Sequence, residues 1–261
     1  MTRVARVLRA EWTKLRSVRS TVWSLVALVV LDLGFTALFA LLNEAQWDRN
    51  DAQFRNTIMA DPTGLILGGG LELSQLAVCV LGVLVISSEY ATGTIRASLL
   101  AVPRRVPVLA AKALVFGLLM VVLGSALSVA SFFIGAPILH AKAPVAIGDP
   151  GVLRAVLGGG LYIAMLGLFA LAIGAILRHA AAGITVTVAL ATVLSVLSQL
   201  LSGSLGEHVR AALPVQAGRL ITQAHQAPAD LLTPWQGYGV FAAWTAALLV
   251  VAAVLLRRRD A

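Results

Sequence analysis

The sequence is dominated by six apolar segments, each long enough to cross a lipid bilayer as a single helix. A bilayer core of about 30 Å requires about 20 helical residues at about 1.5 Å each. The alternating polarity typical of β-barrel strands is absent. We therefore predict an all-α membrane protein, one domain of residues 1–261, whose six transmembrane helices lie near residues 22–42, 65–86, 113–139, 155–177, 180–201 and 237–256.

Composition supports this class. Charged residues make up 12% of the chain, whereas a soluble domain has about 25%. The fourth and fifth segments are separated only by Arg178 and His179, which predicts a tight antiparallel hairpin. The third segment is long and should tilt, or bend near Pro137. We expect no cleavable signal peptide, because the first apolar segment is too long and no soluble domain follows it.

The basic residues predict the orientation of the chain. Fourteen of the 20 Lys and Arg residues precede the first segment, lie in residues 87–112, join the fourth and fifth segments, or follow the sixth. Loops rich in Lys and Arg remain cytoplasmic. We therefore expect a multi-pass protein of the cytoplasmic (inner) membrane with both termini in the cytoplasm. This topology explains the net charge of +8, and we expect no nucleic-acid partner, because the basic residues are spread over four short segments.

Residues 3–20 have the pattern of an amphipathic helix lying on the membrane surface. Apolar residues recur at helical spacing on one side, while arginines fall mainly on the other, where they can meet anionic lipid. Glu11 lies among the apolar residues, so we expect it to pair with Lys14 or to reach a partner. Candidate functional residues of this helix are Glu11, Trp12, Lys14 and Arg16. The simpler alternative is a charge cluster that only sets the topology.

Residues 87–112 are the polar segment with the most distinctive pattern. Glu89 and Arg96 are seven residues apart, so a helix would place them on one side, and Gly93 between them permits close approach of another backbone. Pro103 ends the stretch, and further basic residues follow. A short helix of this kind, held close to the membrane, suits docking into a groove of a soluble protein. A plain solvated loop is the alternative.

The same segment resembles the loop between the second and third spans of type-2 ABC export permeases. The matching residues are Glu89, Gly93, Thr94, Ile95, Leu99, Pro103, Arg105 and Lys112. The sequence EWTKLRSVRSTVWSL from Glu11 is similar to the surface helix before the first span of that family. The end, TPWQGYGVFAAW from Thr233, is similar to actinobacterial members. Together with the six-span plan, the resemblance covers nearly the whole chain.

The resemblance implies a permease subunit of an ATP-driven exporter, and the largely apolar interior with few fixed charges is compatible with a hydrophobic or amphiphilic substrate. In that family the loop is a coupling helix that contacts a separate ATPase subunit, and a second permease copy, identical or related, completes the pore. It implies coupling roles for Glu89, Tyr90, Gly93, Thr94, Arg96, Arg104 and Arg105. Tyr90 and Ala91 stand where many members carry charged residues.

We expect no enzymatic activity and no cofactor in this chain; ATP and Mg would bind the partner. The phosphate-binding pattern G-x-x-x-x-G-K-[ST] is absent from the sequence. The glycine triplets at 68–70 and 158–160 fall within spans, where they predict close helix packing. The four histidines lack zinc-site spacing, and Ser204 lacks the setting of an intramembrane serine protease.

Two carboxylates fall inside predicted spans, and both are candidates for a substrate path or gate. An acidic residue at the bilayer centre costs about 3 kcal/mol, so Asp32 and Glu72 should face the protein interior or a cavity. No Lys or Arg is deep in a span to pair with them, so we expect hydroxyl and amide partners, chosen from Ser74, Gln75, Ser125, Ser128, Ser131 and Gln199. A purely structural hydrogen bond is the alternative at either site.

Other functions stay open at this point. A proton-coupled secondary transporter would use Asp32 and Glu72 and need no ATPase, although the internal repeat expected of many such carriers is not visible. A structural or sensory membrane subunit is a third interpretation. Residues 202–236 should form short interfacial helices that cap the last spans, with Pro214 interrupting the first of them.

Overall fold

The computed structural model describes residues 3–94, 105–201 and 203–258, and within them the chain forms helices. Six of these helical stretches are long and apolar enough to cross a membrane, which confirms the six predicted spans. They are α2 (Arg19–Ala45), α4 (Pro62–Ala91), α6 (Arg105–Leu139), α7 (Val152–Leu177), the run Ala180–Ser198, and α12 (Pro234–Arg258). The run Ala180–Ser198 is made of α8 (Ala180–Val188), the π-helix η1 (Ala189–Val193) and most of α9 (Leu194–Gln199).

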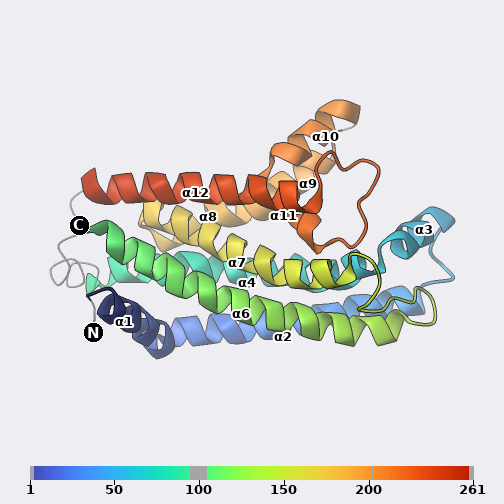
Figure 1. Cartoon of the computed structure of the whole chain (residues 1–261), viewed down its shortest axis with the longest axis horizontal. Helices are drawn as coiled ribbons and strands as arrows, with labels where there is room; N and C mark the ends of the chain where they lie inside the picture. Colours follow the sequence, from blue (N-terminus) through green and yellow to red (C-terminus); the bar gives the residue numbers. More distant parts are fainter. Residues whose placement is uncertain (1–2, 95–104, 202, 259–261) are drawn as a thin grey trace.

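The long helices lie side by side in one bundle (Figure 1). The end of α4, the start of α6 and the end of α12 lie at one end of the bundle, which we call the termini end, and α1 (Arg3–Ser17) lies there too (Figure 1). Four short helices lie at or toward the other end, the distal end: α3 (Ala52–Ala60), α10 (Gly203–Ala212), α11 (Pro214–Arg219) and the 3-10 helix η2 (Leu220–Thr222). The bundle thus brings the segments with most basic residues to a single end.

The core is built around α4 and α7, the two spans with the largest buried share. Glycines let these helices approach their neighbours, as the triplets predicted. A Cβ at Gly70 would meet the Thr36 side chain and the Asp32 carbonyl oxygen of α2. A Cβ at Gly160 would meet the backbone of Ser125 on α6, at 2.5 Å from its nitrogen. Close backbone approach is therefore a fixed feature of both contacts.

The ends of α4 follow from local sequence. Asp61 accepts a hydrogen bond from the Gly64 backbone N–H, and Pro62 occupies the first turn, a common helix start. The helix ends at Ala91, and Gly93 then takes a positive φ of 71°. The predicted span is shorter than this helix, because α4 continues past the apolar residues to include Glu89 and Tyr90. Similarly, α6 begins at Arg105 and so contains Lys112.

The hairpin between the fourth and fifth spans is as tight as predicted. Arg178 takes a left-handed conformation with φ 54°, and the His179 side chain accepts the Ala182 N–H at the start of α8. The expected short helices in residues 202–236 are present as α10 and α11. Pro214 does more than interrupt the first helix, because it occupies the first turn of α11.

Candidate functional site

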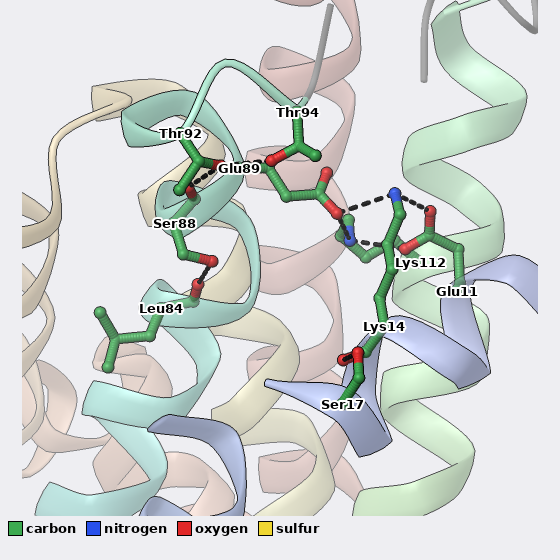
Figure 2. A network of polar contacts seen from close by, with 9 residues as sticks. All are labelled: Glu11, Lys14, Ser17, Leu84, Ser88, Glu89, Thr92, Thr94 and Lys112. Carbon is green, nitrogen blue, oxygen red and sulfur yellow. Dashed lines mark hydrogen bonds and ion pairs between the residues drawn. The ribbon is translucent and has the colours of Figure 1, made fainter. Parts of the chain in front are cut away.

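Four charged side chains form a closed ring of ion pairs at the termini end. Lys14 Nζ lies 2.9 Å from both Glu11 Oε1 and Glu89 Oε1. Lys112 Nζ lies 2.5 Å from Glu11 Oε2 and 2.9 Å from Glu89 Oε1. Figure 2 shows the two lysines between the two carboxylates, with α1, α4 and α6 each contributing to the group. We call these four residues the charge ring.

The charge ring is largely shielded from solvent. Glu11, Glu89 and Lys112 are 3%, 7% and 3% exposed, while Lys14 is partly exposed. Two cations alternate with two anions, so each buried charge has an opposite charge in contact and the group is formally neutral. Burying these charges without partners would be costly. The charge ring therefore fixes how α1 lies against α4 and α6.

Lys14 remains charged in this setting. Burial by itself lowers the pKa of Lys14, but hydrogen bonds and charge attraction from Glu11 and Glu89 outweigh it and raise that pKa above its ordinary value. A raised lysine pKa stabilises the folded state at all pH values below the ordinary one. That contribution is lost only when the pH rises through the raised pKa. The Lys14 contacts therefore persist throughout the physiological range.

The structure places the predicted site residues of residues 3–20 on two sides of α1. Glu11 faces the bundle and pairs with Lys14, one of the two outcomes that its position predicted. Trp12 is 42% exposed, and Arg16 is exposed as well. The side of α1 that bears Trp12 and Arg16 is thus available to lipid or to another protein.

The coupling candidates of the α4–α6 connection divide into four groups. Glu89 is buried in the charge ring, and Tyr90 lies beneath the Arg178 guanidinium, 5.1 Å from the ring centre. Gly93 and Thr94 are exposed just beyond the end of α4. Arg96 and Arg104, and with them Ile95, Leu99 and Pro103, lie outside the described residues. Arg105 begins α6.

Lys112 is the residue of this site that the sequence interpretation did not single out. It was noted only as the lysine that closes the loop pattern. The signal was its position, since it directly precedes a long apolar run and is the last charge before the third span. A lysine at that place in a buried helix needs an anionic partner, but the sequence does not say which one.

Asp32 lies where α2, α4 and α6 meet, and it is 3% exposed. Its Oδ2 accepts a hydrogen bond from Ser74 at 2.8 Å, and its Oδ1 accepts one from Ser131 at 2.7 Å. Both serines were among the partners that the sequence predicted. Thr36, which follows Asp32 by one helical turn, and Ser128, which precedes Ser131 by one turn, are also buried. Their hydroxyls have no hydrogen-bond partner in the part of the chain that the structure describes. Asp32 thus joins three spans.

Replacing Asp32 separates a structural role from a proton-carrying one. We expect Asp32→Asn to leave stability and transport close to wild type, because an amide can accept from one serine and donate to the other. Asp32→Ala should lower the free energy of unfolding by about 2 kcal/mol, because two buried hydroxyls lose their partner. Thermal unfolding and a transport assay on both variants test this. Loss of transport in a well-folded Asp32→Asn protein would instead support a titrating carboxyl.

Glu72 has a cationic partner that the sequence interpretation missed. Arg219, at the end of α11, donates from Nη2 to Glu72 Oε1 at 2.6 Å. Arg219 is not part of a span, so a search for basic residues within spans could not find it. It reaches Glu72 because α11 lies near the distal part of α4, and Gly68 leaves room beside its guanidinium. The Glu72 side chain is 46% exposed and that of Arg219 is 23% exposed, so the expectation that Glu72 is buried in the protein interior is wrong.

Comparison with known families completes the identification. No curated protein matches the chain. The sequence model of the family described as ABC-2 family transporter protein matches residues 7–202, three-quarters of the chain, and covers most of α1, the charge ring, Asp32 and Glu72. That match, with six apolar helices in one bundle, agrees with the resemblance of the loop pattern, and the chain belongs to the ABC-2 family of ABC transporter membrane proteins.

Proposed function

We propose that this chain is the permease subunit of an ATP-driven exporter in the cytoplasmic membrane. The observation that carries the proposal is the charge ring, which joins α1, α4 and α6 immediately next to the α4–α6 connection. A force applied by a partner at this connection would reach three helices at once. Two permease subunits and two cytoplasmic ATPase subunits complete the transporter, and ATP and Mg bind the ATPase subunits.

The long helices suit the transmission of such a force. With 30 and 35 residues, α4 and α6 are about 45 and 52 Å long, enough to cross the bilayer and its head-group regions. A displacement at the termini end therefore reaches the distal end through two continuous helices. We infer that both termini are cytoplasmic, since most Lys and Arg residues lie at this end.

The burial of Glu89 changes the role that the loop pattern suggests for it. A side chain held by Lys14 and Lys112 cannot also reach into a partner without breaking those ion pairs. We infer that Glu89 positions the connection, whereas exposed Gly93 and Thr94 lie where an ATPase can touch them. Arg96, Arg104 and Arg105 remain proposed contacts, as do Trp12 and Arg16 on α1.

The substrate that we propose is hydrophobic or amphiphilic, because the spans contain few charged residues. Membership in the ABC-2 family favours this function over a proton-coupled carrier. Asp32 and Glu72 stay candidates for a path or gate under either function.

Gly93 gives the sharpest test of ATPase coupling. A Cβ at Gly93 would meet nothing within 4 Å in the described part of the chain, so a side chain there points into open space where a partner can approach. The cost in the isolated protein is the positive φ, which disfavours a residue that has a Cβ. We expect Gly93→Trp to reduce the permease-dependent ATPase rate of the reconstituted complex by about tenfold, the effect of losing one central interface contact.

The matched control is Gly93→Ala, which places a Cβ at the same positive φ without the bulk of tryptophan. It should retain most of the stimulated ATPase rate, and both variants should melt at similar temperatures. Equal stimulation by Gly93→Trp and wild type would mean that the ATPase does not dock at the end of α4.

A further inference from the structure

The distal end contains a cavity of about 930 Å³ that no sequence pattern pointed to. It lies between α3 and the first turns of α4 on one side and α10 and α11 on the other, and residues 222–232 complete its wall. Its size falls within the range of small-molecule sites in proteins, which is roughly 300–1,000 Å³. We therefore asked what molecule fits its depth and its chemistry.

A bilayer centred on α4 would place the cavity near the boundary between lipid head groups and hydrocarbon. The 30 residues of α4 span about 45 Å, whereas the hydrocarbon core is about 30 Å thick. About 7 Å at each end of α4 therefore extends into the head-group region. Leu65 and Gly68 line the cavity, and Gly68 lies about 9 Å along the helix axis from Pro62.

Arg219 supplies a cation at this depth. Its Nη2 would lie 4.0 Å from a Cβ on Gly68, and it donates to Glu72 Oε1 at 2.6 Å. A guanidinium carries five N–H donors, and in the described part of the chain no other side chain accepts a hydrogen bond from this one. Burial lowers the pKa of Arg219, but Tyr162 and Glu72 outweigh it and raise that pKa. The group stays cationic with donors to spare.

Three other charged groups of the wall, Asp61, Asp230 and Arg210, have hydrogen-bond partners in the chain. Asp61 Oδ1 accepts from the backbone N–H groups of Gly64 and Ala224, and Asp230 Oδ2 accepts from that of Ala227. Arg210 Nη1 donates to two carbonyl oxygens of the chain. Glu207, three residues before Arg210 on α10, and His225 are the remaining titratable residues of the wall. The cationic donors of the wall are thus Arg219 and Arg210, and in the described part of the chain Arg219 makes the fewer hydrogen bonds of the two.

Apolar side chains make up much of the rest of the wall, including those of Ile58, Leu65, Leu220 and Leu231. We propose that this cavity binds an anionic amphiphile, with a phosphate or carboxylate held by Arg219 and a hydrocarbon chain packed against the apolar wall. A membrane lipid with an anionic head group has this chemistry and this depth. The proposal depends on the geometry of the distal end and not on ATPase coupling.

Photolabelling in nanodiscs of phosphatidylcholine tests the proposal directly. A trace of phosphatidic acid carrying a photoreactive acyl chain is crosslinked, and the labelled peptides are mapped by mass spectrometry. We expect labelling of α3, α11 and residues 222–232, well above that from the corresponding photoreactive phosphatidylcholine. Arg219→Gln should reduce this labelling by about tenfold, the worth of one charged hydrogen bond.

Three further variants keep the test independent of how Arg219→Gln folds. Gly68→Leu narrows the cavity beside Arg219, since a Cβ there meets only the end of the Arg219 side chain, and it should reduce labelling to a similar extent. Gly34→Leu, a substitution into open space on α2, is the matched control and should label like wild type. Glu72→Gln should increase labelling, because the Arg219 guanidinium is then no longer shared.

Competition with inorganic phosphate distinguishes a lipid head group from a free anion as the ligand of the cavity. Excess inorganic phosphate should leave the labelling unchanged if the hydrocarbon chain contributes to binding. Displacement by phosphate alone would show a small-anion site and overturn the lipid assignment. Equal labelling by the two photoreactive lipids, or wild-type labelling of a folded Gly68→Leu protein, would overturn the proposed site as a whole.

Discussion

Replacing Lys112 with methionine is expected to lower the free energy of unfolding by about 3–5 kcal/mol, because it leaves buried carboxylates short of a cation. Lys112 is the buried lysine of the charge ring, at 2.5 Å from Glu11 and 2.9 Å from Glu89. Methionine keeps the length and the apolar stem of the side chain, so the loss of stability measures the contribution of the positive charge. Thermal or denaturant unfolding in nanodiscs measures it.

Lys142→Met is the control for this prediction. Lys142 pairs with Asp48 at 3.7 Å in a setting where the Asp48 side chain is 86% exposed. An exposed pair contributes little, so we expect a loss within about 1 kcal/mol. If Lys112→Met and Lys142→Met proved equally stable, the charge ring would not hold α1 in place.

A neutral version of the charge ring separates loss of charge from loss of packing. We expect Lys112→Met combined with Glu11→Gln and Glu89→Gln to recover most of the stability, since no buried carboxylate is then left without a partner. The triple variant should nevertheless couple poorly to the ATPase, because α1, α4 and α6 are no longer joined by ion pairs. Wild-type ATPase stimulation by a stable triple variant would limit the charge ring to a folding role.

The second large effect is expected at Gly160, where α7 lies against α6. A Cβ at this position would lie 2.5 Å from the Ser125 backbone nitrogen and 2.6 Å from its Cα. Backbone atoms cannot rotate away, so Gly160→Ala must push the two helices apart. We expect a loss of about 3 kcal/mol in the free energy of unfolding, at the upper end of the range for overpacking.

The neighbouring glycine provides a matched comparison. A Cβ at Gly159 would meet the Ser128 side chain, and beyond it only Leu67 at 4.0 Å. Ser128→Gly should therefore rescue Gly159→Ala, whereas Ser125→Gly should not rescue Gly160→Ala. Rescue of both substitutions would show that the contact between α6 and α7 is made by side chains and not by backbone.

Much of the fold could be predicted because membrane spans are a local property. The length and hydropathy of each segment decide whether it crosses a bilayer, and neither depends on the neighbours of that segment. The tight turn at Arg178 and His179 was predictable for the same reason, because only these two residues separate the fourth and fifth apolar segments. The ends of the helices were less accurate, since α4 and α6 continue beyond their apolar runs into residues such as Glu89 and Lys112.

The candidate site was only partly predictable, because its partners come from different helices. The pairing of Glu11 with Lys14 could be predicted, since residues three apart share one side of a helix. The contacts of Lys112 with Glu11 and Glu89 depend on how α1, α4 and α6 pack. Hydroxyl partners for Asp32 were expected as a class, and the packing then selected Ser74 and Ser131.

By itself the sequence determined the class of the protein, the number and approximate positions of its spans, the shared end of its basic segments, and its resemblance to ABC-2 permeases. Only the tertiary structure decided that four charges close into a ring, that Arg219 reaches Glu72, and that a cavity opens beside α11. The reason is physical. Whether a segment crosses a bilayer depends on the hydropathy of that segment alone. The partner of a buried charge depends on which opposite charge the packed helices bring within about 3 Å of it.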